Sequence, residues 1–186
     1  MKNCVILAGG KSSRMGQDKT LMPFGNFATL THFQVDKFSQ IFDNVFVSSK
    51  FEKFDPPLKL IKDKVTDDFS PMLALASILS NFKDESVFIM PADMPFVRVK
   101  TIEELFKFTK EFDIVIPQDD NHTHSLCGFF NSNLADKAKE FYEKGEHKIG
   151  LLHSVCKCKK VKFEDKKEFF NINYFSDYEE ARKVKL

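Results

Sequence analysis

The sequence predicts an α/β fold, in which a mostly parallel sheet lies between two layers of helices. Several short runs of β-branched and aromatic residues are apolar at every position, which is typical of strands that are buried on both faces. Other segments repeat apolar residues at intervals of three and four, the spacing of amphipathic helices. The two kinds of segment alternate along the chain, as they do in parallel sheets whose strands are joined by helices.

The elements expected in the first half of the chain follow this alternation. Strands are expected at residues 5–7, 45–47, 58–61, 87–90 and 114–116. Helices are expected over residues 30–42, 73–82 and 102–109, where Leu, Phe and Ile recur with helical spacing.

The second half of the chain is less regular. Strands are expected at residues 126–130 and 160–163, and helices at residues 134–142 and 149–155. A last helix is expected from about Asp177, because Ser176 and Asp177 precede Glu179 and Glu180 in a pattern typical of a helix start. No repeat, low-complexity tract or linker divides the chain, so residues 1–186 are expected to form a single domain.

Composition narrows the class of protein. The 186 residues are enough to bury a sizeable core, and the apolar fraction of 42% is ordinary for a globular protein. The 28 basic and 27 acidic side chains nearly balance, so no overall charge favours nucleic acid or a membrane surface. The 22 phenylalanines, with no tryptophan, are interpreted as core residues.

Cysteine usage and the lack of a long apolar segment predict a cytoplasmic protein. Cys4, Cys127, Cys156 and Cys158 lack the spacing of a disulfide framework, so we expect reduced thiols. A zinc site formed by His153, Cys156 and Cys158 is disfavoured because the Cys-x-Cys pair has no matching second pair. We find neither a signal peptide nor a run of about 20 apolar residues that could span a membrane.

The stretch CVILAGGKSSRMGQDKT, residues 4–20, joins the first predicted strand to a glycine-rich, basic loop. Ligands of such sheets bind beyond the carboxyl ends of the strands, where this loop lies. Gly9 and Gly10 allow the backbone to approach an anion, and Arg14 and Lys19 can bind phosphate oxygens. The spacing fits neither a Walker A loop nor the Rossmann glycine motif. A nucleoside polyphosphate site is therefore expected, and a glycine-rich surface turn with incidental cations is the alternative.

Two further motifs carry groups that could bind a metal or a substrate. Asp93 directly follows the strand predicted at residues 87–90, and carboxylate oxygens are preferred ligands of Mg²⁺. Asn171 and Asn173 are two residues apart, so on an extended segment their side chains point the same way. The simpler alternatives are an Asp in a proline-rich turn and a pair of capping or turn-forming asparagines.

The loop from Leu7 to Lys19 resembles the signature loop of sugar-phosphate and cofactor nucleotidyltransferases, and more closely that of the molybdenum cofactor guanylyltransferase family. The resemblance implies a Rossmann-like three-layer α/β/α sandwich, as in nucleotide-diphospho-sugar transferases. It also implies transfer of GMP from GTP to the phosphate of molybdopterin, with or without molybdenum, and release of pyrophosphate with Mg²⁺ as cofactor. Other molybdenum cofactor biosynthesis proteins and recipient molybdoenzymes are the partners that it suggests.

The same resemblance assigns roles to particular residues. Arg14, Lys19 and Asp93 are expected to be catalytic, with Asp93 holding the metal. Asn171 and Asn173 are expected on the acceptor or metal side. The residues expected to bind the nucleotide are Leu7, Ala8, Gly9, Gly10, Lys19, Ser48, Asp63 and Asp93.

The chain departs from the family pattern in places. Ser48 stands where the family has an asparagine, and Ser70 to Ala74 stand where the family has a Gly-Pro-Leu-x-Gly-like element.

Two alternative functions remain open from the sequence. A cytidylyltransferase would use CTP on molybdopterin or on a sugar or polyol phosphate; the Gly9-Gly10 pair favours guanylyl transfer by resemblance. A non-catalytic molybdopterin carrier would keep the fold, but it would have no need for Arg14, Lys19 and Asp93 together.

Overall fold

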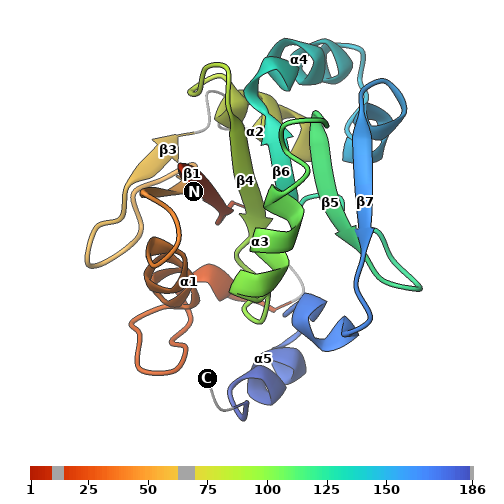
Figure 1. Ribbon diagram of the computed structural model, residues 1–186. Helices are drawn as coiled ribbons and strands as arrows, with labels where there is room; N and C mark the ends of the chain where they lie inside the picture. The colour runs from red at the N-terminus through yellow and green to blue at the C-terminus, as the bar shows by residue number, and fades with distance from the viewer. Residues whose placement is uncertain (10–14, 63–69, 185–186) are drawn as a thin grey trace.

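The computed structural model describes residues 1–9, 15–62 and 70–184 (Figure 1). Within these ranges, seven strands form one sheet in the order β3-β2-β1-β4-β6-β5-β7. The strands are β1 (Asn3–Leu7), β2 (Asn44–Ser49), β3 (Leu60–Lys62), β4 (Ser86–Pro91), β5 (Ile114–Gln118), β6 (Gly128–Asn131) and β7 (Cys158–Lys162). Strand β6 runs antiparallel to β4 and β5, and the other pairs are parallel. The prediction of a mostly parallel sheet is confirmed.

Helices cover both faces of the sheet, which confirms the predicted three layers. The α-helices are α1 (Leu30–Ser39), α2 (Pro71–Leu79), α3 (Val99–Phe106), α4 (Ala135–Glu143) and α5 (Phe175–Ala181). Shorter 3₁₀ turns are η1 (Lys19–Leu21), η2 (Ser132–Leu134), η3 (Ile149–Ser154) and η4 (Lys166–Phe169). Side chains of α1 and α3 pack on one face of the sheet, and those of α2 and α4 pack on the other.

Phenylalanine fills the core between the sheet and the layer of α1 and α3, as expected from its abundance. Phe88 on β4 is fully buried and stacks on Phe42, with ring centroids 5.6 Å apart. Phe129, which pairs with Phe88 across the sheet from β6, lies 5.0 Å away in a tilted arrangement. Such aromatic pairs stabilise a core beyond the area that they bury.

A third apolar cluster joins the two ends of the chain. Met22, Phe24 and Leu30, which lie between η1 and the start of α1, pack with Ile172 and with residues of α5. The hydroxyl of Tyr178 donates a hydrogen bond to the carbonyl of Pro23 at 2.5 Å. This cluster holds the segment before α5 against the N-terminal loop, and Figure 1 shows α5 beyond the end of the sheet near α1.

Some element boundaries differ from the prediction. Residues 149–154 form a 3₁₀ turn and not a longer helix, and β7 begins at Cys158, two residues before the predicted start. The last helix begins at Phe175, because Asp177 lies inside its first turn and accepts hydrogen bonds from the N–H groups of Asn173 and Tyr174. Asp177 thus satisfies backbone donors that a helix start leaves unpaired.

The described ranges contain neither a membrane-spanning helix nor a cluster of metal ligands. None of their helices is long and apolar enough to cross a bilayer. Nor do they contain a group of three or more His, Cys, Asp or Glu side chains placed to hold a metal ion. In the Cys-x-Cys segment, Cys156 donates a hydrogen bond from its thiol to the carbonyl of Leu152 at 2.9 Å.

Candidate active site

Three parallel strands end side by side and bring the predicted nucleotide-binding residues to one edge of the sheet. In the sheet register, Leu7 at the end of β1 pairs with Ser48 on one side and with Pro91 on the other. The N–H of Ala8 donates to the carbonyl of Ser48 at 2.9 Å, and the N–H of Ala92 donates to the carbonyl of Leu7 at 3.0 Å. The carboxyl ends of the strands therefore fix Leu7, Ala8 and Ser48 next to the turn that carries Asp93.

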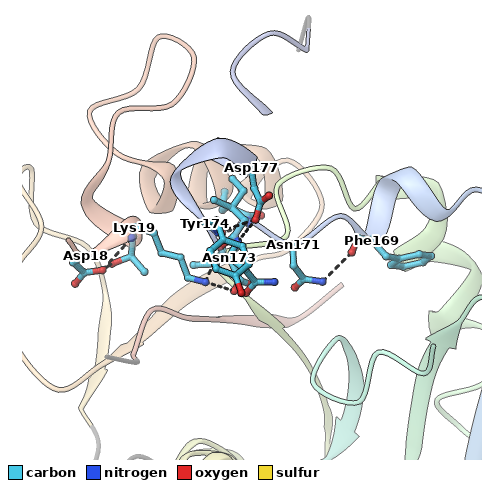
Figure 2. A network of polar contacts seen from close by, with 12 residues as sticks. Asp18, Lys19, Phe169, Asn171, Asn173, Tyr174 and Asp177 are labelled. Atoms are coloured by element: carbon cyan, nitrogen blue, oxygen red, sulfur yellow. Dashed lines mark hydrogen bonds and ion pairs between the residues drawn. The ribbon is translucent and has the colours of Figure 1, made fainter. Parts of the chain in front are cut away.

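Lys19 connects this edge to the C-terminal segment, as Figure 2 shows. Its ammonium group lies 2.5 Å from Oδ2 of Asp93 and donates a second hydrogen bond to the carbonyl of Ile172 at 2.8 Å. The N–H of Ile172 in turn donates to the backbone carbonyl of Asp93 at 2.9 Å. Three segments that are far apart in the sequence are thus joined at Lys19 and Asp93.

The carboxylate of Asp93 is suited to a divalent cation. Lys19 occupies Oδ2, but Oδ1 is buried and has no hydrogen-bond partner among the described residues. A buried polar atom without a partner is rare in a folded protein, because leaving it unpaired costs free energy. A hard cation such as Mg²⁺ or Mn²⁺ takes carboxylate oxygens as ligands. Asp93 therefore fits the predicted metal-binding role by its chemistry.

The two predicted asparagines lie on either side of Ile172, so the structure places them beside the Lys19–Asp93 pair. The side-chain amide of Asn171 donates to the carbonyl of Phe169 at 3.1 Å, a contact drawn in Figure 2. The backbone N–H of Asn173 is held by Asp177 at the start of α5. The segment is therefore fixed at both ends, with Ile172 fully buried between the asparagines.

A groove of about 590 Å³ adjoins this edge of the sheet. Pro91 and Met94, which flank Asp93, line it together with Asn171. Its other lining residues are Pro71 at the start of α2, His124–Cys127 before β6, and His147–Gly150 around the start of η3. The groove could hold an elongated small molecule with one end near Asp93.

Some groups in the groove are unsuited to covalent catalysis. Burial, with a further contribution from the charge of Glu168, raises the pKa of the Cys127 thiol to about 12. A thiol with this pKa is not a nucleophile at neutral pH. His124 is held by Asp119 at 3.0 Å and stacks on Phe169, with ring centroids 4.4 Å apart. These properties favour a site that binds and orients a ligand over one that forms a covalent intermediate with it.

The segment that departs from the family pattern begins with a helix cap. Ser70 precedes α2, and its hydroxyl accepts a hydrogen bond from the N–H of Leu73 at 3.4 Å. The same hydroxyl contacts Nδ1 of His147 in the groove, at 2.8 Å. Ser70 thus caps the N-terminus of α2 and also contacts a residue that lines the groove.

One well-placed cation, Lys53, was not predicted from the sequence. Lys53, in the connection between β2 and β3, reaches the signature loop (residues 7–19), where its ammonium group contacts the carbonyl of Ala8 at 2.9 Å and Asp18 at 2.5 Å. Burial alone would raise the pKa of Asp18, but the hydrogen bonds from Lys53 and Thr20 lower it overall. Lys53 belongs to no motif, so nothing short of the fold could have revealed this contact.

The structure thus brings together most of the predicted site residues that it describes. Lys19, Asp93, Asn171 and Asn173 converge, and Leu7, Ala8 and Ser48 lie at the adjoining strand ends. Gly9 is exposed at the start of the loop. Gly10, Arg14 and Asp63 lie outside the described residues, and their roles stay predictions.

Comparisons with known proteins match nearly the whole chain. The family model of the MobA-like NTP transferase domain matches residues 4–156. A molybdenum cofactor guanylyltransferase from Campylobacter jejuni strain RM1221 is 51% identical over 182 residues, covering 97% of this chain and 95% of that protein. Another from Helicobacter pylori strain G27 is 25% identical over 186 residues, covering 97% and 92% of the two chains.

A solved structure shares the fold. The crystal structure of molybdopterin-guanine dinucleotide biosynthesis protein A from Archaeoglobus fulgidus matches with a TM-score of 0.82 at 22% identity. The match covers 98% of this chain and 97% of that one, so the two proteins have the same arrangement of sheet and helices.

Proposed function

The chain belongs to the molybdenum cofactor guanylyltransferase family, within the MobA-like NTP transferases, and we propose that it uses the site at Lys19 and Asp93 for this nucleotidyl transfer. The substrates are GTP and molybdopterin, or molybdopterin that already carries molybdenum. The products are the guanine dinucleotide form of the cofactor and pyrophosphate. The observation that carries the proposal is the meeting of Lys19, Asp93 and the Asn171–Asn173 segment at the ends of β1 and β4.

The reaction is an in-line displacement at the α-phosphorus of GTP. An oxygen of the acceptor phosphate forms the new P–O bond, and the bond between the α-phosphorus and the bridging oxygen breaks, so pyrophosphate leaves. The attacking group is already an anion, and the protein needs no strong base. Its task is to align two polyanions and to offset their repulsion.

Lys19 is proposed to hold the triphosphate. An ammonium group has three N–H donors, and contacts to Asp93 and Ile172 use two of them. The third can donate to a phosphate oxygen, and Arg14 is proposed to add a second cation. The backbone of Leu7, Ala8 and Gly9 would face the nucleotide, with Ser48 and Asp63 beside it.

Asp93 is proposed to hold Mg²⁺ through Oδ1, the oxygen that is buried without a hydrogen-bond partner among the described residues. When bound, the cation would offset negative charge on the phosphate oxygens. Asn171 and Asn173 would complete the acceptor or metal side. The groove beside Asn171 is proposed to receive molybdopterin, with the acceptor phosphate toward Asp93.

The alternatives differ in their support. The 51% identical relative is a molybdenum cofactor guanylyltransferase, which supports guanylyl over cytidylyl transfer. A carrier without catalysis is disfavoured because Lys19 and Asp93 form a mostly buried ion pair, and burying two charges is costly where no function requires it.

The proposal can be tested by incubating the purified protein with Mg²⁺, molybdopterin and each nucleoside triphosphate in turn, and measuring pyrophosphate. Release with GTP and little with the other three is expected. Release with CTP alone would show a cytidylyltransferase, and release with none of the four would favour the carrier.

A further inference from the structure

We propose that Lys53 is a positioning residue for nucleotide binding, which acts by holding together the two ends of the signature loop. The inference rests on the proposed use of this loop for GTP. Lys53 lies outside the loop, in the connection between β2 and β3, and touches both sides of it: Ala8 before the glycines, and Asp18 and Thr20 after them.

The ammonium group of Lys53 has a full set of hydrogen-bond acceptors. Its ammonium group is surrounded by three oxygens, at 2.9 Å from the carbonyl of Ala8, 2.5 Å from Oδ2 of Asp18 and 2.9 Å from the hydroxyl of Thr20. The side chain of Lys53 is only 19% exposed. Because these three oxygens match the three N–H donors of the ammonium group, no donor is left unpaired.

The segment that carries Lys53 is itself fixed to α1. Phe54 is buried and meets the ring of His32 edge-on, with ring centroids 6.0 Å apart. His32 also contacts the carbonyl of Pro56 through Nε2 at 2.8 Å. The ammonium group of Lys53 lies 5.4 Å from the centroid of the Phe54 ring, which favours a cation at that place. Lys53 is therefore held in position before any ligand arrives.

The three residues at the end of the loop alternate in direction. Asp18 and Thr20 turn toward Lys53, whereas Lys19 between them reaches Asp93. By fixing the residues on both sides of Lys19, Lys53 helps to fix where Lys19 points. It also neutralises Asp18, whose negative charge would otherwise repel a triphosphate bound in this loop.

The test compares Lys53→Met with Lys62→Met. Lys62 lies nearby on β3 and pairs with Glu52 on the surface, with both side chains more than half exposed, so its variant removes the same charge without touching the loop. GTP binding with Mg²⁺ is measured by calorimetry in the absence of molybdopterin. The dissociation constant is expected to rise about tenfold for Lys53→Met, as for loss of a charge-assisted contact, and to stay within about twofold for Lys62→Met.

Kinetics separates positioning from simple destabilisation. A loop that holds substrate and transition state alike changes KM for GTP and leaves kcat within about threefold, whereas partial unfolding lowers the apparent kcat and leaves KM unchanged. Equal GTP affinity in folded Lys53→Met and Lys62→Met overturns the inference. If wild-type protein binds no GTP, the proposed function itself fails.

Should Lys53→Met not fold, Thr20→Val serves in its place. It removes one oxygen from around the ammonium group and nearly keeps the side-chain volume. A rise of about threefold in the dissociation constant for GTP is expected, and an unchanged constant overturns the inference.

Discussion

Replacing Lys19 by Met is expected to affect catalysis far more than stability. The variant removes an ammonium group that contacts Asp93 at 2.5 Å and Ile172 at 2.8 Å, and leaves both oxygens of Asp93 without a described partner. Hydrogen bonds to charged groups are worth about 2 kcal/mol, so the free energy of unfolding should fall by about that amount. Turnover should fall by about 10²-fold or more, because a cation that faces developing charge is lost.

The assay for this prediction combines urea unfolding with steady-state pyrophosphate release. Lys107→Met is the matched control, since Lys107 pairs with Glu104 at 2.5 Å on the surface of α3 with both side chains exposed. Such pairs contribute little, so this variant should stay within about 1 kcal/mol of wild type in stability and keep its turnover. A folded Lys19→Met protein with a turnover near that of Lys107→Met would show that Lys19 has no catalytic role.

Three further substitutions test the metal ligand, the sheet and a buried cation. Asp93→Asn should lower turnover by about 10²-fold or more and weaken the response of activity to added Mg²⁺, because an amide is a poor replacement for a carboxylate on a hard cation; an unchanged Mg²⁺ titration would contradict this role. Gly128→Ala should cost about 3 kcal/mol or more in urea unfolding, because its Cβ would lie 2.3 Å from the carbonyl oxygen of Val115 at a φ of +155°. Gly150→Ala, whose Cβ meets nothing within 4 Å, is its control and should be nearly neutral. Burial lowers the pKa of Lys37 to about 8, and the charge of Glu168 partly opposes this shift. Between pH 8 and the normal lysine pKa of about 10.4, the unfolded chain therefore binds more protons at Lys37 than the folded chain does. The stability of wild type relative to Lys37→Met should therefore rise over this pH range, and parallel pH profiles of the two proteins would count against it.

The fold was predictable for the central strands, which are buried on both faces. The runs around Val5, Val47 and Ile89 are apolar at every position because helices cover both faces of the central strands. Prediction was weaker at the edge of the sheet, where β7 reads Cys-Lys-Lys-Val-Lys and each of its residues is half-buried or exposed. The start of α5 was misplaced because Asp177 resembles an N-cap residue in the sequence. In the structure it lies within the first turn of the helix and accepts hydrogen bonds from the N–H groups of Asn173 and Tyr174.

The sequence predicted that several of the candidate site residues would lie together, but it did not predict their contacts. The strand ends explain why Leu7 and Asp93 come to one edge, and sequence motifs identified Lys19 and the asparagines. Loop spacing alone indicated a polyphosphate site, whereas the guanine base and the pterin came from resemblance to a family. The contacts of Lys53 with the signature loop could not be predicted. They depend on how Phe54 packs against His32 and on the fold that brings Lys53 to the carbonyl of Ala8.

The most direct measurement is the mass of the pterin product. Wild-type protein is incubated with GTP, Mg²⁺ and molybdopterin, and the pterin is analysed by mass spectrometry. We expect molybdopterin to gain one GMP unit while pyrophosphate is released in equal amount. Recovery of unmodified molybdopterin from a folded, GTP-binding protein, with no pyrophosphate formed, would contradict it.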